Sequence, residues 1–204
     1  VTAKHHDGFC IWNSPSTEYD MGSTTSKIDV LEELSKACTK HGLDMGLYLS
    51  PWDIHDKSYG NSDGNADNYN DFYDKQLREI LDNPKYGRDG KFVEVWMDGA
   101  KGTGQDAQVY DFERFAKTIK DLEGDDCVIF QCGLQSDVRW SGNENGLAPD
   151  TVWNRVKIDG KWDPKTSDKM PWQTENNQPI KDQNRVHAGD PNGDKWVMSE
   201  ADAR

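Results

Sequence analysis

The 204-residue chain has no run of 18 consecutive apolar residues, so no segment of the sequence predicts a transmembrane helix. It also has little positive charge, because 24 Lys and Arg stand against 37 Asp and Glu and give a net charge of −13. Such a surface repels polyanions, so we expect neither a nucleic-acid nor an anionic membrane partner. A neutral ligand such as a sugar would not be repelled, although an acidic surface can also serve solubility alone.

Several common reactive motifs are absent as well. None of the four cysteines forms a CxxC pair with metal-ligand spacing. The glycine-rich segment 99–104 precedes a predicted helix but does not match a phosphate-binding loop. His5 and His6 are adjacent, and adjacent residues of a strand point to opposite faces, so we expect no metal site here. We expect no cofactor.

The hydrophobic pattern alternates between short strands and amphipathic helices, which is typical of parallel βαβ units. Ser26 and Asp29 are predicted to open the first helix, and Gly42 is its predicted end. Residues 53–68 are polar and predict a surface loop, whereas residues 133–195 show little periodicity. Strands are expected over 1–5, 45–50, 92–96, 127–130 and 195–199, and helices over 29–42, 69–81 and 112–122.

These patterns define the expected fold class. About five strands are fewer than the eight of a closed (β/α)₈ barrel, which typically needs about 250 residues. We therefore expect an α/β fold, with residues 1–204 forming part of a TIM barrel that is truncated at both ends. The first residues read as the inside of a strand, without a Met or a signal peptide, so we expect the natural product to extend in the amino-terminal direction.

Polar or aromatic side chains follow every expected strand. Catalytic residues of parallel barrels lie at such carboxyl ends, and those of several strands meet at one face. A lone Asp before Gly99 could be only a turn residue, but convergence at five strand ends favours a functional site. The candidates are His5, His6, Tyr48, Trp52, Trp96, Asp98, Arg139, Trp140, Glu144 and Glu200.

Their chemistry favours retaining glycoside hydrolysis, which needs two carboxyl groups on either side of the anomeric carbon. Asp98 suits the group that stays ionised, which hydrogen bonds favour. The group that donates a proton needs a raised pKa, and Glu144 and Glu200 are both candidates. Adjacent histidines can bond sugar hydroxyls. The eight tryptophans offer flat apolar faces for a pyranose ring.

Four segments, taken in order, resemble the α-L-fucosidases of glycoside hydrolase family 29. They are KHHDGF from Lys4, GLYLSPWD from Gly46, EVWMDGA from Glu94 and RWSGNENG from Arg139. The resemblance covers residues 1 to about 155 and returns weakly at 195–202. It implies a retaining hydrolase that removes terminal α-L-fucose by double displacement. The family's fold is a (β/α)₈-like barrel with a β-sandwich behind it, and we see no sandwich in this sequence.

The resemblance also implies roles for individual residues. The nucleophile is Asp98, flanked by Trp96, and His5, His6 and Tyr48 bind fucose. In the branch that cleaves α-1,3/1,4-linked fucose, the acid/base is the Glu of a W-x-G-N-E segment, so we prefer Glu144 to Glu200.

The remaining implications are less specific. Arg139 resembles an arginine that contacts the sugar or the acceptor. The substrate would be a fucosylated glycan, and the analogy suggests secretion or the periplasm. The alternatives are a catalytically silent fucose-binding fragment and a barrel glycosidase that acts on another sugar.

Overall fold

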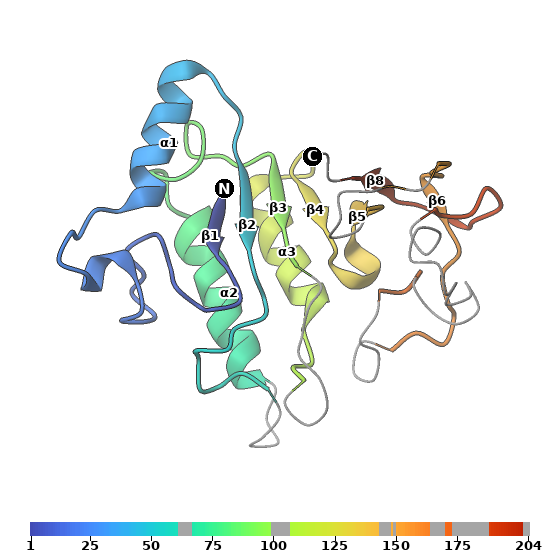
Figure 1. Ribbon diagram of the computed structural model, residues 1–204, viewed down its shortest axis with the longest axis horizontal. Helices are drawn as coiled ribbons and strands as arrows, with labels where there is room; N and C mark the ends of the chain where they lie inside the picture. The colour runs from blue at the N-terminus through green and yellow to red at the C-terminus, as the bar shows by residue number, and fades with distance from the viewer. Residues whose placement is uncertain are drawn as a thin grey trace.

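The computed structural model describes residues 1–60, 67–98, 107–142, 148, 150–163, 170–172 and 188–201. At its centre lies a parallel sheet of six strands in the order β1-β2-β3-β4-β5-β8 (Figure 1). The strands are β1 (Thr2–Lys4), β2 (Gly46–Leu49), β3 (Glu94–Trp96), β4 (Val128–Phe130), β5 (Val138–Trp140) and β8 (Met198–Glu200). A separate antiparallel pair joins β6 (Arg155–Val156) to β7 (Lys195–Trp196).

Three helices connect the first strands, namely α1 (Val30–His41), α2 (Asp67–Leu81) and α3 (Phe112–Glu123). The predicted ends of α1 are confirmed. The Asp29 carboxylate accepts a hydrogen bond from the backbone N–H of Glu32, and Gly42 ends the helix with a left-handed φ of 66°. Among the described residues, no helix is both long and apolar enough to cross a membrane.

The register of the sheet assigns side chains to its two faces, because neighbours in register share a face. Leu47, Val95 and Ile129 are aligned on β2, β3 and β4 and are fully buried. They form the core with apolar residues of α2 and α3, which cover this face of the sheet in Figure 1. The opposite face carries Tyr48, Trp96, Phe130, Val138 and Met198 in register.

The strand prediction needs two corrections. The sheet has six strands where about five were expected, because β5 lies in the segment 133–195 that showed no periodicity. β5 is Val-Arg-Trp between Asp137 and Ser141, so it lacks the apolar run that marks β3 and β4. The single strand predicted over 195–199 is two strands, since β7 pairs with β6 while β8 pairs with β5.

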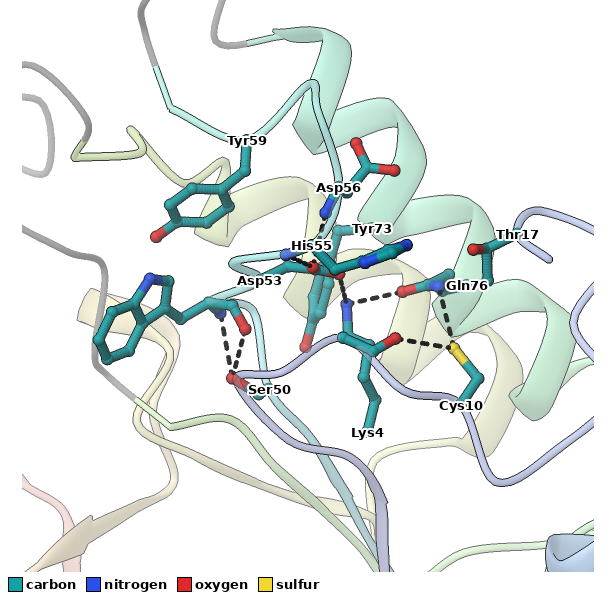
Figure 2. A network of polar contacts seen from close by, with 12 residues as sticks. Lys4, Cys10, Thr17, Ser50, Asp53, His55, Asp56, Tyr59, Tyr73 and Gln76 are labelled. Carbon is teal, nitrogen blue, oxygen red and sulfur yellow. Dashed lines mark hydrogen bonds and ion pairs between the residues drawn. The ribbon is translucent and has the colours of Figure 1, made fainter. Parts of the chain in front are cut away.

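The prediction of a polar surface loop over 53–68 is wrong at its first residue. Asp53 is 2% exposed and forms an ion pair of 3.1 Å with the fully buried Lys4. Lys4 Nζ also donates to Gln76 Oε1 at 2.8 Å and lies 5.4 Å from the centre of the Tyr73 ring (Figure 2). The network ties the end of β1 to the loop after β2 and to α2. The carboxylate of Asp53 can be buried because the ammonium group of Lys4 is buried beside it.

Candidate active site

The candidate site lies at the carboxyl edge of the sheet. The strands β1, β2 and β3 run in parallel and end next to one another at this edge (Figure 1). His5 and His6 directly follow β1, Ser50 follows β2, and Asp98 lies two residues beyond β3. Parallel pairing therefore brings side chains from three distant segments together, as the alternation of strands and helices predicted.

Asp98 is held by two neighbours from the other strand ends. Tyr48 Oη donates a hydrogen bond to Asp98 Oδ2 at 2.9 Å, and His6 Nε2 lies 3.5 Å from the same oxygen. Burial lowers the pKa of His6 and His5 acts in the same direction, whereas Asp98 and Asp7 raise it. Burial is the largest cause, so the neutral ring is favoured near pH 7 and His6 faces Asp98 as a hydrogen-bond donor.

The expectation that His5 and His6 point to opposite faces is wrong. The strand β1 ends at Lys4, and a turn follows in which the N–H of Gly8 donates to the carbonyl of His5. The two rings consequently lie 4.1 Å apart, with 48° between their planes. Both can serve one ligand. Within the described part of the chain, no group of three or more His, Cys, Asp or Glu residues could hold a metal ion.

A stack of aromatic rings runs across the strand ends. Tyr48 and Trp96 are stacked with centroids 4.9 Å apart, and Phe130 covers the other face of Trp96 at 4.0 Å. Trp96 therefore presents an edge rather than a face to a ligand. The partly exposed Trp52 packs against His6 with centroids 4.6 Å apart, so Trp52 is better placed to offer its face to a sugar ring.

Sequence reasoning missed two residues that support this arrangement. Phe130 would have required the register of β4 against β3, which alternation alone does not give. Ser50 lies inside the quoted segment GLYLSPWD, and its Oγ is 2.7 Å from His6 Nδ1. The available signal for Ser50 was its position between Tyr48 and Trp52, two residues that were predicted to bind the ligand.

Glu200 and Trp140 are aligned on β8 and β5 and share the sheet face of Val138. Glu200 pairs with Glu94, a residue that sequence reasoning did not single out. Burial, the neighbouring charge of Glu200 and a hydrogen bond with Glu200 raise the pKa of Glu94 to about 7. Glu200 itself is exposed at the end of β8.

The other two predicted residues stand apart from this group. Glu144 lies outside the described residues. Arg139 is 1% exposed, and alternation along β5 turns it to the face opposite Trp140. Its Nη2 donates to the backbone carbonyl of Trp153 at 2.7 Å, and burial lowers its pKa to about 10. The guanidinium thus binds the loop after β5, and the expected contact of Arg139 with the sugar or the acceptor stays a prediction.

Comparisons with known proteins show the family to which the chain belongs. The family model described as alpha-L-fucosidase matches residues 1–187. Alpha-L-fucosidase 1 of Arabidopsis thaliana is 37% identical over 205 residues, which cover 99% of this chain and 35% of that protein. A Ruminococcus gnavus family 29 fucosidase solved in complex with fucose is 47% identical with a TM-score of 0.81, covering 100% of this chain and 42% of that one. A family 29 glycoside hydrolase from an unknown rumen bacterium is 33% identical with a TM-score of 0.72, and the match covers 99% of this chain and 34% of that one.

The parallel sheet and the strand-end site define part of an α/β catalytic barrel of the glycoside hydrolase class, which confirms the predicted fold class. Within that class, the chain belongs to the alpha-L-fucosidase family. This chain spans about a third of the length of the two plant relatives that match nearly its whole length.

Proposed function

We propose that the protein is an α-L-fucosidase, that residues 1–204 are part of its catalytic barrel domain, and that it releases terminal α-L-fucose from fucosylated glycans with retention. The observation that carries the proposal is the environment of Asp98, which accepts a hydrogen bond from Tyr48 and faces the histidine pair. Such neighbours fix the direction of the carboxylate, as a nucleophile requires. The fucose bound to the Ruminococcus gnavus relative supports the choice of sugar.

The reaction follows from these placements. Asp98 attacks the anomeric carbon while the acid/base, which we assign to Glu144, gives its proton to the departing glycosidic oxygen. The same residue then takes a proton from water, whose oxygen displaces Asp98 from the anomeric carbon and regenerates the carboxylate. His5 binds sugar hydroxyls, His6 directs its Nε2 toward Asp98, and Trp52 packs against the ring.

The choice of Glu144 over Glu200 rests on its W-x-G-N-E segment, which resembles the acid/base segment of the α-1,3/1,4-cleaving branch. Glu200 is exposed at the end of β8, and its carboxyl interacts with that of Glu94. Glu200 is therefore the alternative acid/base.

The assignment predicts a chemical-rescue experiment. Glu144→Ala should lose most activity on a substrate with a poor leaving group, keep more on an aryl fucoside with a good one, and regain turnover when azide is added, because azide needs no general base. Initial rates with and without azide measure this. Glu200→Ala is the matched control and should show no azide rescue. Rescue of Glu200→Ala in place of Glu144→Ala would refute the assignment.

The W-S-G-N-E segment supports a preference for α-1,3/1,4-linked fucose. We expect the full-length protein to release L-fucose from both a Lewis-type trisaccharide and an aryl α-L-fucoside, as measured by quantifying free fucose. Release from the aryl fucoside alone would contradict the linkage preference and leave the activity standing. Fucose binding without release from either substrate would contradict the activity itself.

A further inference from the structure

The buried Ser50 joins the two segments that hold the histidine pair and Trp52. Its backbone N–H donates to the carbonyl of Lys4 at 2.9 Å, which fixes it beside the end of β1. Its Oγ accepts a hydrogen bond from the N–H of Trp52 at 3.1 Å and lies 2.9 Å from the Trp52 carbonyl (Figure 2). The same Oγ is 2.7 Å from His6 Nδ1. Ser50 is thus within bonding distance of two acceptors but has one proton to give.

A count of protons decides which acceptor takes it. A neutral imidazole carries one N–H, on either Nδ1 or Nε2. His6 Nε2 lies 3.5 Å from Asp98 Oδ2, and a bare Nε2 would direct its lone pair at a carboxylate. The favourable neutral form has the proton on Nε2, which leaves Nδ1 as an acceptor for the Ser50 hydroxyl. If His6 gains a second proton, Nδ1–H donates to Oγ and the hydroxyl turns to the Trp52 carbonyl.

We infer that Ser50 is a positioning residue, which holds the Nε2–H of His6 on Asp98 by bonding Nδ1 in either protonation state. The charged and titratable groups that face His6 are Asp98 from the end of β3 and His5 and Asp7 from its own loop. None of these supplies a hydroxyl to Nδ1. The contact therefore sets the tautomer and the direction of the ring, as partners of metal-bound histidines do.

The kinetic consequence rests on the proposed function. When water releases the sugar, the electron pair of the broken bond returns to Asp98, and donors on Oδ2 stabilise the charge that forms. A His6 ring that is free to turn would stabilise it less. The effect falls on the release of the sugar from Asp98, which follows its attachment, so Ser50 should influence kcat more than kcat/KM.

The test compares Ser50→Ala with Ser50→Thr, which keeps the hydroxyl, and with Ser35→Ala, which removes a buried hydroxyl on α1. On an aryl α-L-fucoside, we expect Ser50→Ala to lower kcat about 10- to 100-fold and to lower KM with it, by analogy with histidine-orienting partners elsewhere. Ser50→Thr should restore most of kcat, and Ser35→Ala should leave it unchanged. Equal losses in Ser50→Ala and Ser35→Ala would overturn the inference.

A second readout is independent of activity. In protein labelled with nitrogen-15 histidine, the His6 signals are those that disappear in His6→Gln. We expect a neutral ring with its proton on Nε2 and an Nδ1 shift that reports an accepted hydrogen bond, which Ser50→Ala loses. Identical Nδ1 shifts in the wild type and Ser50→Ala would overturn the inference even in an active enzyme. A changed shift in a protein that releases no fucose would support the contact and contradict the proposed function.

Discussion

Replacing Asp98 by asparagine is expected to lower kcat/KM on an aryl α-L-fucoside on the order of 10⁴-fold or more, which corresponds to about 5 kcal/mol of lost transition-state stabilisation. Asparagine has nearly the same shape and can still accept the hydrogen bond of Tyr48 Oη, so the pocket is preserved. The neutral amide cannot form the glycosyl ester through which a double displacement proceeds. Initial rates measure the loss.

Two controls separate loss of the nucleophile from loss of the fold. Asp44→Asn changes an exposed carboxylate that pairs with Arg88 ahead of β2, and it should leave the rate unchanged. Asp98→Asn should also keep the circular dichroism spectrum of the wild type and still bind fucose in a titration calorimeter. A turnover of Asp98→Asn within tenfold of the wild type would show that another group attacks the sugar.

Replacing Lys4 by methionine is expected to destabilise the fold by about 3–5 kcal/mol, because the change leaves Asp53 as an uncompensated buried charge. Both side chains are almost wholly enclosed, and Gln76 and Tyr69 also lose the bonds that Lys4 Nζ donates to them. Methionine fills a similar volume, so a cavity contributes little. The free energy of unfolding in urea measures the change.

Removing both charges tests whether the unpaired charge of Asp53 is what destabilises Lys4→Met. The double variant Lys4→Met/Asp53→Leu should recover much of the lost stability, since well-packed apolar pairs often replace buried ion pairs at little cost. Lys36→Met removes an exposed ion pair with Glu32 and should cost less than about 1 kcal/mol. If Lys4→Met is no more destabilising than Lys36→Met, the buried pair does not hold the ends of β1 and β2 in place.

Much of the fold could be predicted because its signals are local. The ends of α1 were readable in Asp29 and Gly42, since capping depends on residues within one turn. The buried state of Asp53 was not readable, because its partner Lys4 lies 49 residues away and a polar loop looks the same with or without such a partner. The strand β5 has Arg139 at its centre and lacks the apolar run by which β3 and β4 were recognised.

The same distinction applies to the site. Asp98, Tyr48 and His6 were predicted because each follows or lies in a recognisable strand, and the structure brings them into contact. The direction of Arg139 was not predictable, because a shift of one residue in register reverses the face to which a side chain points. Phe130 likewise depends on the alignment of β4 with β3.

The most direct test of the account is the anomeric form of the first fucose released. Proton NMR can follow the hydrolysis of an aryl α-L-fucoside by the full-length protein before the product mutarotates. A double displacement at Asp98 predicts that α-L-fucose appears first and the β-anomer only later. The β-anomer as first product would contradict attack by Asp98, and the absence of any released fucose would contradict the proposed function.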